Sequence, residues 1–342
     1  MNMTDWFHAQ RIAPSKKAIP ILSFPATQLM HISVSDLTSS SEHQARAMRM
    51  IAERCDTGAS VSMMDLSVEA ECFGSAIKFS QDEVPAVTGS LITNRQDALD
   101  LRVPRIGCGR TGVYLKAMEH AAAAISDRPV FAGVIGPFSL AGRLMGMTDI
   151  LLNCYIEPET VQITLEKAAQ FLTDYIKHYK STGANGVIMA EPAAGLLSPK
   201  LIEEFSSKYV KKIAQATQDG DFAFIYHNCG SVVPLLDSIF SIGAGAYHFG
   251  NAVDMSVVLE KAPEGVCVLG NIDPVTQFRH GTYESIWTAT QNLLVACGDD
   301  ARFIISSGCD IPPLASWANI DAFFKSVCAY YDKKGRASSG RP

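Results

Sequence analysis

The stretch Phe222-Ala-Phe-Ile-Tyr-His-Asn-Cys-Gly230 is an apolar run that ends in polar residues and a glycine. A continuous apolar run of this length predicts a strand over Phe222–His227 that is covered on both faces, as strands of parallel sheets are. Comparable β-rich runs recur along the chain. They predict seven further strands, at Ala18–Leu22, Ser60–Asp65, Val130–Gly136, Gly186–Glu191, Gly245–Gly250, Val266–Gly270 and Arg302–Ser306.

Helical patterns separate these strands. Pro158 and Pro199 stand where a first helical turn accepts proline. Eight strands that alternate with helices predict an α/β fold, a single (β/α)8 TIM barrel, and a doubly wound parallel sheet is the alternative. The predicted helices are Glu42–Thr57, Thr111–Ile125, Pro158–Thr182, Pro199–Gln218, Ser231–Phe240, Met255–Lys261, Tyr283–Ala296 and Ser316–Tyr331.

The chain shows no internal repeat and no linker, so residues 1–332 are predicted to form one barrel domain. Residues 72–91 carry no helical pattern and are predicted to be an extended excursion over the barrel mouth. The polar residues 333–342 are predicted to be a disordered tail.

Composition excludes several classes of partner. The chain has 342 residues, 47% of them hydrophobic, a net charge of −6 and no Lys/Arg run longer than a dipeptide, which argues against nucleic-acid binding. The longest apolar stretch, residues 130–142, is interrupted by Pro137 and is too short to span a membrane. The N-terminal residues lack the apolar run of a secretory signal, so a cytoplasmic protein is expected. Sequence does not indicate the oligomeric state.

Nine cysteines at scattered spacing do not suggest a disulfide framework. Most of them, such as Cys267 in an apolar strand, are predicted to be buried as small apolar side chains.

Two of the cysteines stand where a metal site is expected. In an extended chain, residues i and i+2 point the same way about 6.6 Å apart, so one ion can bind both His227 and Cys229. Cys309 follows another strand, 80 residues later (309 − 229). A barrel brings the carboxyl ends of its strands to one mouth, although these two strands are three apart on the predicted ring.

A Cys2His set offers zinc three protein ligands, which is typical of a catalytic site with one open position. Two thiolates and a neutral imidazole balance the +2 charge, and an added thiol would be held as a nucleophilic thiolate. We therefore predict that His227, Cys229 and Cys309 are both the zinc ligands and the catalytic residues.

Polar side chains at other predicted strand ends are candidates for substrate binding. Each also has a structural interpretation, as a loop or helix cap or as part of a turn. These candidates are Asp65, Glu69, Glu191, Asn271 and Asp273.

The chain resembles the uroporphyrinogen decarboxylase superfamily and, within it, the methylcobamide:coenzyme M methyltransferase branch. The resemblance extends from about Pro20 to Tyr331. Matching stretches are Met64-Asp-Leu-Ser-Val-Glu-Ala-Glu-Cys-Phe-Gly74, Gly136-Pro-Phe-Ser-Leu-Ala-Gly142, Glu191-Pro-Ala-Ala-Gly-Leu-Leu-Ser-Pro199, His227-Asn-Cys-Gly230, Gly270-Asn-Ile-Asp-Pro274 and Ser307-Gly-Cys-Asp-Ile-Pro-Pro313.

The resemblance implies a (β/α)8 barrel with one zinc ion on His227, Cys229 and Cys309. It also implies an enzyme that moves a methyl group from a methylated corrinoid to a thiol, coenzyme M or a similar one. The Asp-X-His-X-X-Gly motif of corrinoid-carrying domains does not occur in the sequence, so the methylcorrinoid is expected on a separate corrinoid-binding protein.

Three departures from the family pattern stand out. The Met-Arg-Gln-Ala-Gly-Arg stretch of true decarboxylases is replaced by residues 20–28, which contain no arginine to hold a polycarboxylate. Where methyltransferases often carry a carboxylate, the chain has Gly250 and Asn251, which leaves His248 or water as the expected fourth zinc ligand at rest. Glu191 stands where the branch commonly has Asp.

Three alternative functions remain open from the sequence. They are a metal-free decarboxylase of the uroporphyrinogen type, a zinc methyltransferase with a folate donor, and a non-catalytic barrel that binds a corrinoid or a thiol. The shared fold does not separate them.

Overall fold

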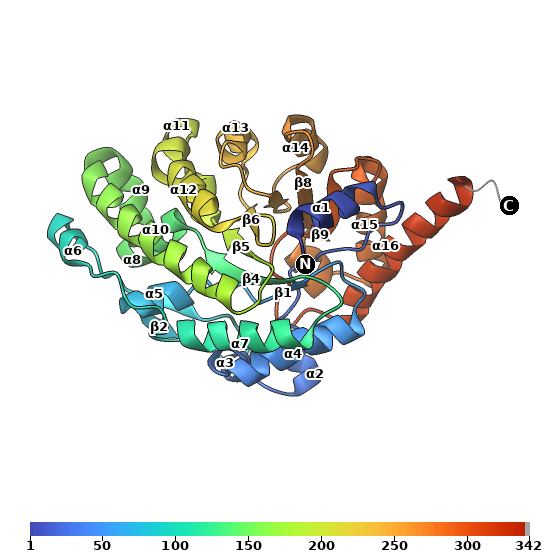
Figure 1. Ribbon diagram of the computed structural model, residues 1–342, viewed down its shortest axis with the longest axis horizontal. Helices are drawn as coiled ribbons and strands as arrows, with labels where there is room; N and C mark the ends of the chain where they lie inside the picture. Colours follow the sequence, from blue (N-terminus) through green and yellow to red (C-terminus); the bar gives the residue numbers. More distant parts are fainter. Residues whose placement is uncertain (339–342) are drawn as a thin grey trace.

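The computed structural model describes residues 1–338, and at its centre lies a curled sheet of parallel strands with helices around it (Figure 1). Seven strands pair in the order β1-β4-β5-β6-β7-β8-β9, all in parallel. Parallel neighbours need a crossover connection, and helices supply it between successive strands. The strands are β1 Ser60–Val61, β4 Val130–Ile135, β5 Gly186–Ala190, β6 Ala223–Asn228, β7 Ala246–Phe249, β8 Cys267–Ile272 and β9 Phe303–Ser307.

The segment predicted as the first strand, Ala18–Leu22, is not a regular strand. It lies between the two edges of the sheet, because Ile19 donates to Ile305 of β9 at 3.0 Å and its neighbour Ala18 accepts from Gly58, just before β1, at 2.9 Å. The Ile21 amide bonds to the Ser307 hydroxyl instead of to a carbonyl, which interrupts the ladder. The α/β class is confirmed, and seven regular strands replace the predicted eight.

The predicted helices occur, and two of them are divided. The helix expected from Pro199 turns through a π-helical segment, and the one expected at residues 231–240 begins with a 3-10 turn. Their bounds are α4 Ser41–Arg54, α7 Thr111–Ala124, α10 Pro158–Ser181, α11 Pro199–Ile202, η2 Glu203–Ser207, α12 Lys208–Thr217, η3 Val233–Leu235, α13 Leu236–Phe240, α14 Met255–Lys261, α15 Tyr283–Cys297 and α16 Trp317–Ser338.

Other helices escaped prediction because they are short. Helix α8, of nine residues, directly follows the apolar strand β4, and its mostly apolar side chains continue that run. The additional helices and helical turns are α1 Met3–Ile12, α2 Ala26–Met30, α3 Val34–Ser39, α5 Val68–Phe73, α6 Arg95–Asp100, α8 Pro137–Met145, α9 Met147–Ile156, η1 Pro192–Leu196 and η4 Pro274–Arg279.

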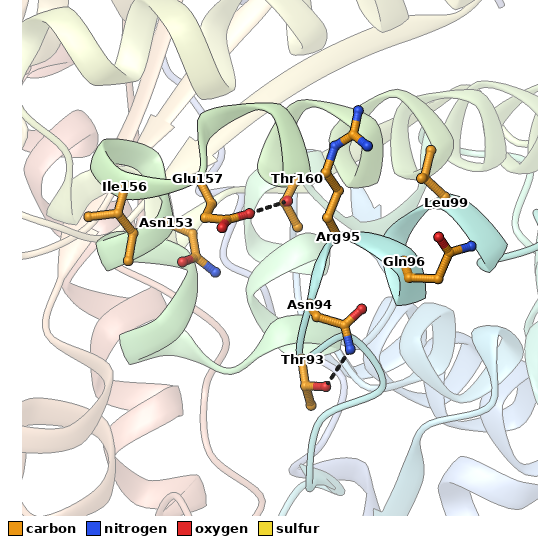
Figure 2. A pocket seen from close by; sticks show the side chains of 9 residues that line it. All are labelled: Thr93, Asn94, Arg95, Gln96, Leu99, Asn153, Ile156, Glu157 and Thr160. Atoms are coloured by element: carbon orange, nitrogen blue, oxygen red, sulfur yellow. Dashed lines mark hydrogen bonds between the residues drawn. The ribbon is translucent and has the colours of Figure 1, made fainter.

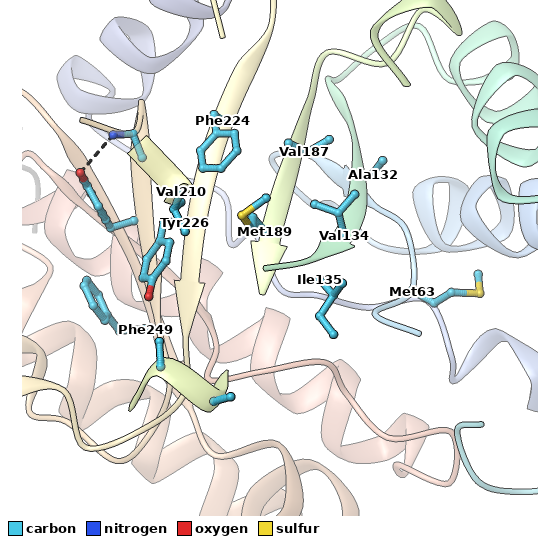
Figure 3. Packing of buried hydrophobic residues seen from close by; sticks show 14 of the residues in the cluster. Met63, Ala132, Val134, Ile135, Val187, Met189, Val210, Phe224, Tyr226 and Phe249 are labelled. Carbon is cyan, nitrogen blue, oxygen red and sulfur yellow. Dashed lines mark hydrogen bonds between the residues drawn. The ribbon is translucent and has the colours of Figure 1, made fainter. Parts of the chain in front are cut away.

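Side chains of the strands alternate between two apolar layers, as the period of an extended chain requires. Val187, Met189, Phe224 and Tyr226 point outward and pack beneath the helices (Figure 3). Residues of the opposite parity fill the interior of the curled sheet; they include Phe131, Ile188, Ala190, Ala223, Ile225, Ala246, Cys267, Leu269 and Ile304. Cys267 is 1% exposed, which confirms its prediction as a buried apolar side chain.

Helix α1 covers the amino ends of the strands. Met3 belongs to the interior cluster, and Trp6 and Phe7 pack against it, with the Trp6 ring 5.9 Å from the ring of Phe131. The thiol of Cys267, at the start of β8, lies 3.8 Å from the Phe7 carbonyl. With the amino ends covered, the carboxyl ends of the strands are the place for a site.

Residues 72–91 contain a hairpin of β2 Ala76–Lys78 and β3 Ala86–Thr88, while the first two of these residues close α5. The hairpin loop contacts distant parts of the chain: the Gln81 carbonyl accepts from Val34 at 2.7 Å, and Glu83 pairs with Arg279, which follows β8, at 3.5 Å.

The tail predicted as disordered, residues 333–342, begins within a helix. Helix α16 continues to Ser338, and Lys334 on it pairs with Asp299. Residues 339–342 of the predicted tail lie outside the described residues. Among the helices of residues 1–338, none is both long and apolar enough to cross a membrane.

Candidate metal centre

The structure brings the three predicted metal ligands together. His227 is the last residue but one of β6, and Cys229 directly follows that strand. Cys309 follows β9 by two residues. Their donor atoms all lie within 4.8 Å of one another, and His227 Nε2 is 3.6 Å from Cys309 Sγ. In a tetrahedral zinc site with ordinary bond lengths, a sulfur and a nitrogen ligand are about 3.6 Å apart. The donor set therefore fits a zinc ion in number, type and spacing.

The two thiols affect each other's ionisation. Hydrogen bonding from Cys309 lowers the pKa of Cys229 to about 4, and the same contact raises the pKa of Cys309. Two negative sulfurs this close repel each other unless a cation lies between them. His227 is 1% exposed, whereas both cysteines are partly exposed, so the open side of the centre is the sulfur side.

A second layer of polar residues lies behind His227. Its partner across the β6–β7 pairing is His248, and the two Nδ1 atoms are 2.7 Å apart. The other nitrogen of His248 lies 2.7 Å from Ser306 Oγ on β9. Burial, and then the neighbouring His227, lower the pKa of His248 well below its usual value. Both nitrogens of His248 have hydrogen-bond partners, so water is favoured over His248 as the fourth ligand at rest.

The positions where a fourth ligand was sought offer none. A side chain at Gly250 would place its Cβ 2.5 Å from Cys229 Cα, closer than atoms can approach. The Asn251 amide donates to Asp273 at 3.0 Å. The backbone beside Cys229 thus excludes a carboxylate at position 250.

Asp65 is buried in an ion-pair network rather than held free for a ligand. Its carboxylate accepts hydrogen bonds from Arg110, from the Tyr114 hydroxyl at 2.8 Å and from the Ser67 hydroxyl at 2.6 Å. Arg110 also contacts Glu71 at 2.6 Å. This network ties the residues after β1 to the start of α7.

Glu69 is 2% exposed and accepts from the Ile135 amide at 3.1 Å through one oxygen. Its second oxygen has no hydrogen-bond partner among the described residues. Burial raises the pKa of Glu69 to about 7. One oxygen of Glu69 is thus used within the protein, and the other is left unused by the described residues.

Glu191 caps α8. Its two carboxylate oxygens accept from the amides of Phe138 at 2.7 Å and Ser139 at 2.8 Å, the first turn of that helix. A Cβ at Gly136 would lie 2.4 Å from the Glu191 carboxylate, so the close approach depends on glycine there. Both oxygens are used within the protein, which supports the structural interpretation over the predicted substrate-binding role.

Asn271 and Asp273 also act within their own loop. The Asn271 amide donates to the carbonyls of Gly250 at 2.9 Å and Val253 at 2.8 Å. Asp273 Oδ1 caps η4 by accepting from the Val275 amide, and from the next amide along, at 2.8 and 2.9 Å. These contacts support the capping interpretation of both residues.

Two cavities differ in their position relative to the strand ends. One of about 590 Å³ lies between α6, the end of α9 and the start of α10, with Arg95, Asn153 and Glu157 in its lining, and no predicted ligand reaches it (Figure 2). Another of about 240 Å³ lies at the carboxyl ends of β4 and β5, and β5 pairs with β6. Among the described residues that line the second cavity, Arg143 is the charged one.

Comparison with known proteins places this geometry in a family. Residues 16–330 match the family model described as uroporphyrinogen decarboxylase (URO-D). The chain belongs to the uroporphyrinogen decarboxylase family. Within this family it is 28% identical, over 271 residues, to the methylcobamide:CoM methyltransferase MtbA of Methanosarcina mazei, with 78% of each chain covered.

Other relatives show the breadth of the URO-D family. A methylated-thiol–coenzyme M methyltransferase of Methanosarcina mazei is 24% identical over 277 residues, 80% of this chain and 73% of that one. A uroporphyrinogen decarboxylase of Synechococcus sp. (strain CC9605) is 29% identical over 220 residues, 62% of this chain and 61% of that one. The expectation of an enzyme from the methyltransferase branch is confirmed by the first two relatives.

A solved methyltransferase from Methanosarcina mazei has the same fold, with a TM-score of 0.85, 20% identity, and 97% of this chain and 99% of that chain covered. This likeness shows the fold alone.

Proposed function

We propose that the chain is a zinc-dependent methyltransferase that moves a methyl group from a methylated corrinoid protein to a small thiol such as coenzyme M. The observation that carries the proposal is the convergence of His227, Cys229 and Cys309 within 4.8 Å. The similar Methanosarcina proteins are named for methylcobamide and for coenzyme M, which supports the choice of donor and acceptor. We interpret the sheet, with residues 18–22 between its edges, as a (β/α)8 barrel.

His227, Cys229 and Cys309 would hold the ion as two thiolates and a neutral imidazole, which balance a +2 charge. When bound, zinc would act as a Lewis acid that keeps an added thiol ionised near neutral pH. The chain's own residues leave room for that thiol. Both cysteines are partly exposed, and Gly250 adds no side chain beside Cys229.

The cavity of about 240 Å³ at the ends of β4 and β5 is our candidate for the acceptor's chain. Its walls include the apolar Leu66, Ile135 and Met147, and Arg143 offers a positive charge to an acidic end group. A small thiol that carries an acid suits this lining better than a neutral one. We further propose that the β2–β3 hairpin covers the mouth, because its loop contacts Arg279 after β8.

Decarboxylation is the main alternative function, because the URO-D family contains decarboxylases. Residues 20–28 contain no arginine for a polycarboxylate. Within this stretch, the Gln28 amide donates to the carbonyls of Pro313 and Ala315 at 2.7 and 2.8 Å and is therefore occupied. A metal-binding thiol pair also has no role in a reaction that needs no metal.

The test is an assay of the zinc-loaded protein with free methylcobalamin and a set of thiols. We expect the methylcobalamin absorbance to fall and the methyl thioether to form, faster with coenzyme M than with neutral 2-mercaptoethanol. Parallel reactions with methyltetrahydrofolate and with uroporphyrinogen address the folate and decarboxylase alternatives. The proposal would be overturned if either of these compounds were turned over and methylcobalamin were not. Tight binding of methylcobalamin without any methyl transfer would also overturn it.

A further inference from the structure

His248 and Ser306 stand behind the metal centre, and the proposed reaction does not itself use them. His248, Ser306 and His227 all face the interior of the curled sheet. Each stands two residues after an interior apolar side chain of its own strand: Ala246 before His248, Ile304 before Ser306, and Ile225 before His227. All three polar residues are at most 1% exposed. Because they are almost completely buried, their hydrogen bonds are made within the protein.

We propose that His248 and Ser306 are positioning residues that hold the His227 ring with its Nδ1 protonated and its Nε2 lone pair directed at the metal. The proposal rests on the metal centre of the proposed function, and not on the identity of the methyl donor or acceptor. A hydrogen-bond chain that begins at a group able only to accept fixes the position of each proton.

That group is the backbone carbonyl of Ile19. The Ser306 hydroxyl donates its proton to this carbonyl at 2.7 Å. The hydroxyl has no second proton, so toward His248 Nε2, at 2.7 Å, its oxygen can only accept. His248 therefore carries its proton on Nε2.

The direction continues to the metal ligand. A neutral His248 with a proton on Nε2 has a lone pair on Nδ1. His227 Nδ1, 2.7 Å away, must then be the donor of the bond between the two rings. The neutral His227 ring has one proton, and with that proton on Nδ1 its Nε2 is free toward Cys309, 3.6 Å away.

The choice of partner matters for charge. Metal-binding histidines usually donate their second N–H to a carboxylate, a carbonyl or water. Here the acceptor is a neutral imidazole, which orients the ring without adding a negative charge next to two thiolates. The ligand set alone then balances the charge of a divalent ion.

The first test is the protonation of the rings in the full chain with ¹⁵N-labelled histidine, measured by long-range ¹H–¹⁵N correlation at pH 9. We expect His227 to show a protonated Nδ1 and a free Nε2 in the metal-free protein, and His248 to show the reverse. Adding zinc should move the Nε2 signal of His227 and leave its Nδ1 proton in place. A metal-free His227 that carries its proton on Nε2 would overturn the proposal.

The second test measures zinc affinity by competition with a chromophoric chelator. His248→Leu removes the acceptor for His227, and we expect zinc binding about 10–100-fold weaker. His248→Gln should restore most of the affinity, because its amide oxygen can accept from His227 while its NH₂ donates to Ser306. Ser306→Ala should weaken zinc binding as well, since it removes the hydroxyl that accepts from His248 Nε2.

Tyr247→Phe is the matched control. It lies on the same strand as His248, faces the outer layer, and loses hydroxyl contacts with Phe240, Gly243 and Ala244. We expect it to lower the unfolding midpoint and leave zinc affinity unchanged, which separates positioning from general destabilisation. Wild-type affinity in folded His248→Leu would overturn the proposal. A wild-type protein that binds no zinc would refute the proposed function. The tautomers of His227 and His248 in the metal-free protein would still show whether the hydrogen bonds run in the proposed direction.

Discussion

Two groups of polar residues lie at the carboxyl ends of the strands, and they differ in what their polar atoms contact. In the ligand group of His227, Cys229 and Cys309, the donor atoms lie close to one another, and the two cysteines are partly exposed residues. In the second group, Asp65 and Glu191 direct their carboxylates into the protein, the first to Arg110 and the second to the start of α8.

The difference shows that a polar residue at the end of a strand is not by itself a ligand-binding residue. Asp65 and Glu191 have the position that a barrel enzyme gives its functional residues, yet hydrogen bonds within the chain use their oxygens. What distinguishes the ligand group is that its lone pairs converge on one point without a protein donor that satisfies all of them.

Cys309→Ser is expected to have the largest effect. Structural zinc sites bind with ~10–16 kcal/mol, so the loss of one of three ligands should weaken zinc binding by about 10²–10⁴-fold and abolish methyl transfer to a thiol. Chelator competition and the methylcobalamin assay measure both. Cys108→Ser, at an exposed cysteine, is the control and should change neither. Full activity of Cys309→Ser would show that the Cys309 thiol is not part of the metal centre.

Asp65→Ala should act on stability and not on the metal. It leaves the buried Arg110 without its main partner, and breaking a buried pair of this kind costs about 3–5 kcal/mol. We expect this decrease in the free energy of unfolding in urea, with zinc content unchanged. The matched exposed pair is Arg49–Glu53, where Glu53→Ala should cost less than about 0.5 kcal/mol. Loss of zinc from folded Asp65→Ala would erase the contrast between the two groups.

Glu69→Gln tests the member of the second group whose oxygens are not both bonded. Burial raises the folded-state pKa of Glu69 to about 7, above the ordinary 4.5. The folded state therefore binds the proton more tightly, so the stabilisation is complete below pH 4.5 and is lost as the pH rises through 7.

We expect Glu69→Gln to flatten this decline and to raise the free energy of unfolding at pH 8 by on the order of 3 kcal/mol. Urea unfolding at pH 4.5 and at pH 8 measures it. An unchanged pH profile, together with a raised KM for the thiol, would instead place Glu69 among the substrate-binding residues.

Much of the fold could be predicted because the strands are continuous apolar runs, and β4 through β9 lie within a few residues of their predicted bounds. Residues 18–22 have the composition of a strand, but the hydroxyls of Ser307 and Ser23 replace backbone partners there, and no local pattern reveals such a substitution. Helix α8 was not predicted because it is short and its apolar side chains continue the apolar run of β4.

The convergence of His227, Cys229 and Cys309 could be predicted because the i, i+2 spacing and the strand ends are local features. The second layer was not assigned because it depends on register: only the pairing of His227 with His248 shows that the two rings meet. The alternation of side chains along residues 245–250 would have placed His248 inward, and that signal was available. The role of Glu191 could not be predicted without α8, whose amides it caps.

The most direct test of the account is metal analysis of the purified protein combined with X-ray absorption at the zinc edge. We predict one zinc per chain with two sulfur neighbours at about 2.3 Å and at least one nitrogen neighbour at about 2.0–2.1 Å. A protein that stays metal-free when zinc is supplied in excess, or a bound zinc with no sulfur neighbour, would contradict it.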